Sequence, residues 1–292
     1  MGSHPSVADL LGVVAGHLPD YPVDSVVRIG AGLDNTAYEV NGELVVRFSR
    51  KPDPDRVDDE ARLLTVLGEV SPLPVPVLVF ADPAQSCLAY TRLAGLPLLE
   101  VPRQQRSGHG ESVATALGGL LSALHSLPLD RLAGLVDTDD HPLGEWRREA
   151  AENYRAVATH VPAAYHRSVE AFLAAAPPDR ADTAVFSHGD LGIEHVLVDP
   201  DTGAVTGVID WSDAAIVDPA YDFGLVYRDL GPAALRAALV AYRTGADVAA
   251  LCQRATFYAR CNLFEDLLYG IETDQERYVD KSLAALDWLF PA

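Results

Sequence analysis

A His-Gly-Asp turn at residues 188–190 constrains the possible folds of this 292-residue chain more than any other feature. The apolar run 196–198 follows the turn, and a second short apolar run, 208–209, ends directly at Asp210. His195 lies between Asp210 and the acid of the turn. Two acids at the ends of neighbouring short strands, with one more ligand between them, suit magnesium–nucleotide chemistry. Phosphoryl transfer needs an acid to orient the hydroxyl nucleophile and ligands for the metal that neutralises phosphate charge.

The order of these residues resembles a known family. The resemblance rests on the His-Gly-Asp turn with His195, on Val-Ile-Asp-Trp-Ser-Asp at 208–213, and on Asp-Pro-Ala-Tyr-Asp at 218–222. This set resembles the antibiotic phosphotransferases, which are relatives of the protein kinases. Most members carry Asn at the position of His195, and a His there is similar to the aminoglycoside 2''-phosphotransferases and the macrolide phosphotransferases. The resemblance implies an α+β, two-lobed, protein-kinase-like fold, with an antiparallel sheet plus helix in the N-terminal lobe and a mainly helical C-terminal lobe.

The resemblance also implies a role for each residue of this segment. Asp190 is expected to accept the hydrogen bond of the substrate hydroxyl and orient it for attack on the γ-phosphate. His195 and Asp210 are expected to hold Mg²⁺ on the nucleotide. Because magnesium prefers oxygen ligands, His195 could instead act through water or contact a phosphate oxygen. His188 and Asp222 are expected to support the loop.

The lobes implied by the resemblance divide the chain into three parts. Residues 1–91 are expected to form the nucleotide-binding lobe, 92–97 the hinge, and 98–292 the helical lobe with the acceptor site. In the first lobe the sequence predicts strands at 26–29, 36–40, 44–48 and 77–80, and a helix at 57–67 that follows a helix at 6–18. Further helices are predicted at 113–127, 145–158, 163–176, 232–242, 248–269 and 275–290.

Two sequence features of the first lobe suggest how a nucleotide is held. Gly30 and Gly32 form a glycine loop between two strands, and glycine lets the backbone approach phosphates closely. Asn41-Gly42 is a favoured two-residue hairpin turn between the predicted strands 36–40 and 44–48. Without other evidence, a Gly-x-Gly pair such as Gly30 and Gly32 is more often a simple turn than a phosphate-binding loop.

The resemblance assigns the remaining nucleotide contacts. Arg47 occupies the strand position at which the family carries a phosphate-binding Lys, and Glu60 is its expected ion-pair partner. The alternatives are a solvent-exposed strand cation for Arg47 and a first-turn helix charge for Glu60. Tyr90, Thr91 and Leu93 are expected at the nucleobase of GTP or ATP, and the bulky Tyr90 resembles the guanine-accepting members, which is consistent with use of GTP.

Composition limits the partners of the protein. The formal net charge is −20, which excludes nucleic acid and would steer a cationic substrate toward the protein, although solubility explains the charge equally well. The three cysteines lack metal or disulfide spacing, and the sequence has no apolar run long enough to span a bilayer. We therefore expect a cytoplasmic protein, and we expect it to be a monomer.

The acceptor is the least determined part of the function. The resemblance predicts that Asp213, Asp229, Glu265 and Asp266 contact a cationic aminoglycoside, but Arg228 stands where that hypothesis requires an acid. A macrolide 2'-phosphotransferase is the alternative, because Leu- and Ala-rich closing helices could form an apolar cleft. A metabolic kinase for a sugar, choline or amino alcohol also fits, as does a pseudokinase that binds nucleotide without turnover.

Overall fold

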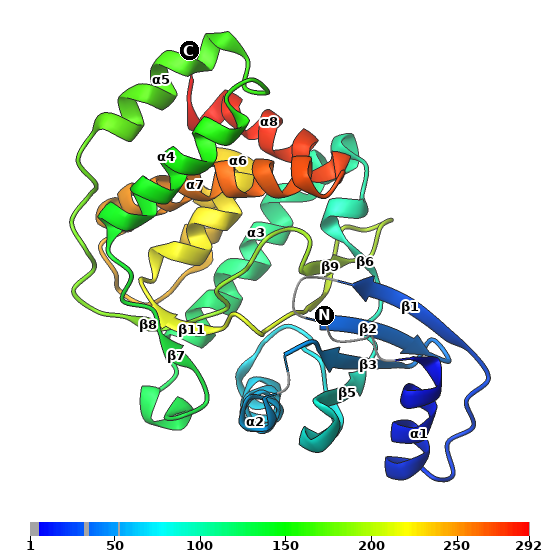
Figure 1. Cartoon of the computed structure of the whole chain (residues 1–292). Helices are drawn as coiled ribbons and strands as arrows, with labels where there is room; N and C mark the ends of the chain where they lie inside the picture. The colour runs from blue at the N-terminus through cyan, green and yellow to red at the C-terminus, as the bar shows by residue number, and fades with distance from the viewer. Residues whose placement is uncertain (1–5, 32–34, 52, 292) are drawn as a thin grey trace.

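The computed structural model describes residues 6–31, 35–51 and 53–291. It confirms the expected α+β class, with a sheet-containing N-terminal lobe and a mainly helical C-terminal lobe (Figure 1). The hydrogen-bonded strand order of the N-terminal sheet is β1-β2-β3-β5-β4, and all neighbouring pairs are antiparallel. The five strands are β1 (Val26–Ala31), β2 (Asn35–Val40), β3 (Leu44–Ser49), β4 (Leu78–Asp82) and β5 (Cys87–Thr91).

The β2–β3 hairpin differs slightly from its prediction. Val40 pairs with Leu44, so three residues rather than two lie between the paired strand ends. Asn41 and Gly42 have φ angles of 54° and 72°, and this left-handed backbone is tolerated well by Asn and Gly. The two residues therefore make the turn that was expected of them within a longer connection.

Two helices flank the sheet, α1 (Val7–His17) and α2 (Pro54–Val70) (Figure 1). Helix α2 begins at Pro54 and is capped by Asp53, whose side chain accepts from the Arg56 N–H. The predicted start at 57 was therefore late, because the Asp-Pro pair is itself a helix start. Glu60 consequently lies beyond the first turn, and the helix dipole does not explain its presence.

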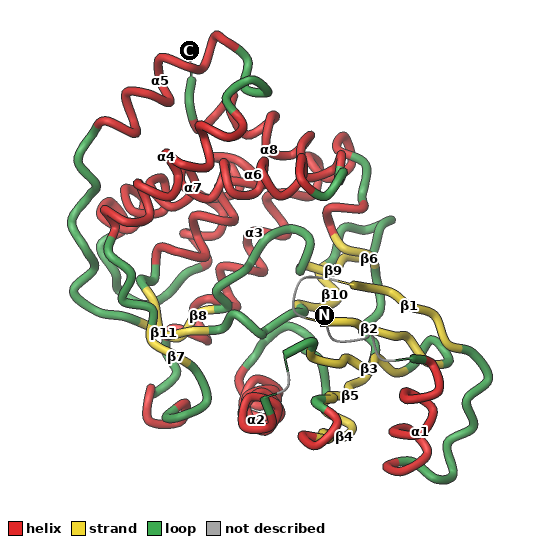
Figure 2. The backbone as a smooth tube through the Cα atoms, in the orientation of Figure 1, coloured by secondary structure: helices red, strands yellow, loops and turns green. Residues whose placement is uncertain are grey.

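Two small sheets lie below the helices of the C-terminal lobe, and the first is near the junction of the lobes (Figure 2). In the first, β9 (Val196–Val198) pairs with β10 (Val205–Val208) and with β6 (Leu96–Pro97), which belongs to the expected hinge. In the second, β11 (Ala215–Val217) pairs with β8 (Val185–Ser187) and β7 (Asp137–Thr138). Gly95 permits the approach of the hinge to β10, because a Cβ there would lie 2.2 Å from the Thr206 hydroxyl.

Six helices build the rest of the C-terminal lobe. They are α3 (Arg103–His125), α4 (Leu143–Val157), α5 (Ala163–Ala174), α6 (Ala220–Ala241), α7 (Val248–Glu272) and α8 (Glu276–Leu289). The short 3₁₀ turns η2 (Leu98–Glu100) and η3 (Leu129–Leu132) also belong to this lobe, whereas η1 (Pro83–Gln85) joins β4 to β5 in the N-terminal lobe. The prediction of a helix starting at 232 captured only the second half of α6. Gly231, with φ 81° and ψ −175°, separates the two halves directly before Pro232, which cannot continue the hydrogen-bond ladder.

Apolar side chains form two buried clusters. The smaller lies between α1 and the sheet, with Leu10, Val14 and Val46 fully buried. The larger joins the C-terminal helices to α2, whose Leu64 and Leu67 belong to it. Within the described part of the chain, no helix combines the length and apolarity needed to cross a membrane. The shared core holds α2 against the C-terminal lobe, which positions the loops between the two lobes.

Candidate active site

The segment that links β8 to β9, called here the 188–195 loop, begins with a turn that only glycine fits. Gly189 has a φ of 82°, and a Cβ at this position would lie 2.0 Å from the Asp213 carbonyl oxygen. Any side chain would therefore separate the loop from the segment that follows Asp210. The His-Gly-Asp spacing is thus a requirement of close backbone packing between two parts of the site.

His188 joins the loop to the strand end that precedes Asp210. The Asp190 N–H donates to His188 Nδ1 over 3.2 Å, so the ring proton resides on Nε2, which donates to the Ile209 carbonyl oxygen over 3.0 Å. The ring is fully buried against Trp211, with ring centroids 4.5 Å apart. Burial lowers the pKa of His188 to about 3, which keeps the imidazole neutral.

Asp222, in the first turn of α6, binds the backbone of the same loop. Its Oδ2 accepts the His188 N–H at 2.8 Å, and its Oδ1 accepts the Gly189 N–H at 3.2 Å. The carboxyl group is fully buried, and burial raises its pKa to about 7 while the two amide hydrogen bonds oppose the rise. Asp222 and His188 together fix the path of the backbone into Asp190.

Asp190, His195 and Asp210 come together at the end of this framework. The side chains of Asp190 and Asp210 are 41% and 42% exposed, whereas that of His195 is 18% exposed. His195 Nδ1 lies 2.8 Å from the Asp190 carbonyl oxygen and 3.4 Å from its carboxylate, while Nε2 lies 3.8 Å from Asp210 Oδ2. Desolvation raises the pKa of Asp190 to about 6, although His195 opposes it. Burial would lower the pKa of His195, but the surrounding carboxylates raise it.

Asp210 has an unusual backbone. Its φ is 60°, a left-handed conformation uncommon for residues other than glycine, and the Ser212 hydroxyl donates to its Oδ1 over 2.7 Å. Burial would raise the pKa of Asp210, but His195 and Arg47 lower it. Strained backbone of this kind concentrates at functional sites, and here it directs a carboxylate toward His195.

These residues fit a magnesium ion that is bound together with a nucleotide. Because His195 Nδ1 donates to a backbone carbonyl, Nε2 keeps its lone pair on the side of Asp210, the arrangement typical of a metal-binding histidine. In the described part of the chain no group of three or more His, Cys, Asp or Glu side chains is suited to a metal. Magnesium typically needs only one or two carboxylates, since substrate phosphates and water complete its coordination.

The predicted pair of Arg47 and Glu60 forms between β3 and α2. The Arg47 guanidinium donates to the Glu60 carboxylate, and its other nitrogen lies 3.6 Å from Asp210 Oδ1. The two side chains are 11% and 15% exposed, so neither is a solvated surface charge. Gly30 lies near the end of β1 beside Ala37, and Gly32 falls outside the described residues.

The expected nucleobase residues lie at the end of β5. Tyr90 is partly buried in β5, and burial raises the pKa of its hydroxyl to about 12 although the charge of Arg47 opposes the rise. The Thr91 N–H donates to the Val77 carbonyl oxygen at 2.9 Å, so this amide already has a partner within the sheet. A nucleobase contact through that amide would require breaking the bond. Leu93 packs its side chain against Gly207 of β10.

The four predicted acceptor residues do not line one surface. Asp213 is exposed beside the 188–195 loop, and Glu265 is exposed on α7. Asp229 and Asp266, in contrast, have side chains only 2% and 8% exposed, each paired with Arg228. Their burial and pairing give no support to the predicted contact of Asp229 and Asp266 with the acceptor. Arg228 occupies the position of the missing acid because it compensates these buried carboxylates.

Glu265 instead lines an acidic cavity of about 240 Å³ between α4 and α7, which is partly open to solvent. Its other lining residues are Trp146, Glu149, Ala150, Glu152, Asn153 and Cys261. Glu149 and Glu152 of α4 were not among the predicted site residues. Their spacing of three residues within a predicted helix indicates that they share a face.

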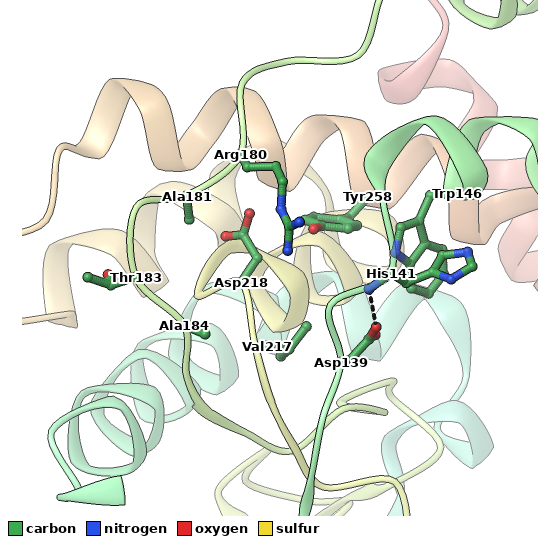
Figure 3. A pocket seen from close by; sticks show the side chains of 10 residues that line it. All are labelled: Asp139, His141, Trp146, Arg180, Ala181, Thr183, Ala184, Val217, Asp218 and Tyr258. Carbon is green, nitrogen blue, oxygen red and sulfur yellow. Dashed lines mark hydrogen bonds between the residues drawn. The ribbon is translucent and has the colours of Figure 1, made fainter.

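A second cavity, of about 40 Å³, is also lined by Trp146 (Figure 3). Figure 3 shows Arg180 and Tyr258 beside Asp218 at the cavity wall. Asp218 caps the start of α6 by accepting the Ala220 N–H at 2.8 Å, and it also pairs with Arg254 at 2.8 Å. Asp218 therefore holds the start of α6 and joins it to α7.

Comparisons with known proteins agree with this geometry. The family model described as the phosphotransferase enzyme family matches residues 25–254. The structure of an aminoglycoside 2'-phosphotransferase-IIIa in complex with GDP has a TM-score of 0.71 and 21% identity, covering 96% of this chain and 97% of that one. The macrolide 2'-phosphotransferase MphH from Brachybacterium faecium has a TM-score of 0.64 and 24% identity, with 95% and 97% covered.

A curated relative resembles only part of the chain. The uncharacterized protein YcbJ of Bacillus subtilis (strain 168) is 33% identical over 101 residues, which is 34% of this chain and 33% of that protein. The family model, in contrast, covers both lobes, from β1 into α7, and includes the whole 188–195 loop. This chain belongs to the phosphotransferase enzyme family.

Proposed function

We propose that this phosphotransferase transfers the γ-phosphate of GTP or ATP to a hydroxyl group of an aminoglycoside. The observation that carries the proposal is the acidic cavity lined by Glu149, Glu152 and Glu265. Aminoglycosides are polycations, and a cluster of carboxylates with an aromatic wall suits an amino sugar. The net charge of −20 would add long-range attraction for the same substrate.

Tyr221 links this cavity to the loop. Its ring lies 5.3 Å from the ring of Trp146, which lines the cavity, and its neighbour Asp222 binds the loop backbone. Burial raises the pKa of Tyr221 well above its usual value, and the negative charges of Glu265 and Asp190 add to the rise. Tyr221 therefore contacts the cavity wall from the same helix turn that holds the loop backbone.

In the proposed mechanism Asp190 accepts the hydrogen bond of the acceptor hydroxyl and orients its oxygen toward the γ-phosphate. The exposed carboxylate is accessible to such a hydroxyl, and His188 and Asp222 hold its backbone in place. The raised pKa of Asp190 favours its action as a proton acceptor near neutral pH. The reaction then depends on positioning rather than on a covalent intermediate.

His195 and Asp210 would hold magnesium with the nucleotide phosphates. When bound, the ion would neutralise the phosphate charge that develops during transfer. Arg47 would contact the phosphates from the sheet side, oriented by Glu60. Arg offers a planar fork where a Lys offers a point charge, so this contact would be more directional than that of a lysine.

An assay of nucleotide-dependent phosphorylation tests the proposal. Kanamycin, gentamicin and a macrolide would each be offered with GTP and with ATP, and product would be followed by mass spectrometry. We expect phosphorylated kanamycin or gentamicin with either nucleotide, and none from the Asp190→Asn variant. Turnover of the macrolide alone would replace the cationic acceptor with an apolar one. Tight nucleotide binding without turnover of any of the three would contradict the proposal.

A further inference from the structure

Beneath the 188–195 loop lies a set of five charged side chains, called here the buried ion cluster. Its members are Glu194, Arg228, Asp229, Asp266 and Lys281, and their side chains are only 2–11% exposed. They come from the loop, from the first half of α6, from α7 and from α8. Charged residues of these types are almost never so deeply buried unless they are paired.

Lys281 is at the centre of the cluster. Its Nζ lies 2.8 Å from Glu194 Oε2, 3.4 Å from Asp229 Oδ2 and 3.0 Å from Asp266 Oδ2. The ring of Tyr278 covers the ammonium group at 4.8 Å, which completes its desolvation. One cation from the last helix of the chain therefore contacts all three acids of the cluster.

Arg228 supplies the second positive charge. Its Nε donates to Asp229 Oδ1 over 2.7 Å and its NH2 group to Oδ2 over 2.9 Å, a bidentate pair with a fixed plane. Its guanidinium also lies 3.8 Å from Glu194 and 3.8 Å from Asp266. Each acid is thus near both cations, and the arrangement has little freedom to rotate.

Two adjacent residues of the 188–195 loop are held by this cluster. The Ile193 N–H donates to Asp229 Oδ2 at 3.1 Å, and the Glu194 carboxylate pairs with Lys281. Gly192 makes room for that carboxylate, because a Cβ there would lie 2.4 Å from Glu194 Oε1. His195 follows directly, with its N–H donating to the Gly192 carbonyl oxygen at 3.0 Å. The loop is therefore clamped immediately before His195.

Stability alone does not account for such a cluster. Burying ions costs several kcal/mol each before pairing, so packed apolar residues of similar volume often stabilise a protein as well or better. Ion pairs and bidentate hydrogen bonds differ from apolar packing in that they impose direction. The directional contacts here end on residues 193 and 194, next to a predicted magnesium ligand.

We propose that Glu194 is a positioning residue, and that its ion pair with the α8 residue Lys281 sets the orientation of His195. This inference rests on the proposed function, in which His195 helps to hold the magnesium nucleotide. Helix α8, which supplies Lys281, lies outside the residues 25–254 that the family model matches.

The test compares Glu194→Ala with the double variant Glu194→Ala/Lys281→Met, using kanamycin and Mg·GTP below the unfolding temperature. A misplacement of about 1 Å can cost on the order of 100-fold in rate, so we expect kcat to fall roughly 10- to 100-fold in both. The KM for kanamycin should change less than about threefold, since Glu194 does not line the acidic cavity. The double variant should be less stable than Glu194→Ala, because Lys281 also contacts Asp229 and Asp266 and its loss leaves these two buried acids without their central cation.

Ser282→Ala is the matched control. Its hydroxyl donates to Asp266 Oδ2 at 3.2 Å, so the variant disturbs the same cluster without touching the loop. We expect a lower Tm with unchanged kcat. A Glu194→Ala variant that keeps wild-type kcat while its Tm falls would assign Glu194 a structural role only and would overturn the proposal.

A second measurement separates this inference from the proposed function. The Mg²⁺ concentration that gives half-maximal GTP binding, measured by calorimetry, needs no acceptor. We expect Glu194→Ala to raise it about tenfold, within the range seen when groups that orient metal ligands are removed. If wild type fails to phosphorylate every antibiotic but this shift appears, the acceptor proposal fails and the positioning role stands. An unchanged magnesium dependence overturns the positioning role whatever the acceptor.

Discussion

The two faces of the 188–195 loop differ in how far their carboxylates are exposed to solvent. Toward the N-terminal lobe, Asp190 and Asp210 leave about two fifths of their side chains exposed, at 41% and 42%. Toward the C-terminal helices, Glu194 and Asp229 are 11% and 2% exposed. Asp190 and Glu194 belong to the same loop and are only four residues apart.

The difference lies in how the charges are compensated. The buried acids contact Lys281 and Arg228 at hydrogen-bonding distances, so their charge is neutralised within the protein. Near Asp210 the closest cation is Arg47 at 3.6 Å, and that guanidinium is already paired with Glu60. Acids left open and incompletely compensated are suited to a metal and a substrate, whereas fully paired acids are suited to fixing geometry.

The largest effect should follow from removing the open acid of the loop. Asp190→Ala should lower kcat by about 10³-fold, within the range that a positioned proton acceptor contributes. GTP binding, measured by calorimetry, should stay within about threefold of wild type, because Asp190 is expected to contact the acceptor rather than the donor. Unchanged turnover would refute the assignment of the open face to chemistry.

Substitutions in the buried ion cluster should lower the free energy of unfolding. Lys281→Met leaves three buried carboxylates without their central cation and should cost about 3–5 kcal/mol in the free energy of unfolding, measured by urea denaturation. Arg277→Met, one turn earlier in α8, is the control, because its pair with Glu100 is exposed and should cost less than about 1 kcal/mol. Equal losses in the two variants would show that burial makes no difference here.

His195 lies between the two faces, and two substitutions test which one it serves. His195→Ala should lower kcat/KM on the order of 100-fold, because a metal contact is worth several kcal/mol of transition-state stabilisation. His195→Asn offers an oxygen, which magnesium prefers, and should keep activity within about tenfold of wild type. A Mg²⁺ titration of activity provides the measurement, and identical curves for both variants would argue against a metal role.

The smallest effect is expected at the acidic cavity. Glu265→Gln should raise the KM for kanamycin about fivefold with little change in kcat, since a partly exposed ion pair contributes up to about 1 kcal/mol. Glu272→Gln, an exposed acid on the same helix outside the cavity, serves as the matched control and should leave KM unchanged. If both variants raise KM equally, general charge attraction rather than the cavity selects the substrate.

Local sequence was sufficient for several features of this protein. The His-Gly-Asp turn and the turn residues Asn41 and Gly42 were predicted, because each depends on a backbone conformation that only a few residue types adopt. The length of the hairpin connection was predicted one residue too short. The fold class and the phosphotransferase family followed from the order of such motifs. The start of α2 and the first half of α6 were missed, since the Asp-Pro start and the Gly231 break obscured their true extent.

Only the tertiary structure decided which charges are buried. Glu194 and Lys281 are 87 residues apart, and Arg228 and Asp266 meet across two helices, so no local pattern distinguishes them from solvated surface charges. For the same reason the acids of α4 were overlooked, and Asp229 and Asp266 were assigned to substrate. Sequence determines which ionisable groups exist and how each backbone turns, whereas burial and pairing depend on segments that meet only after the chain has folded.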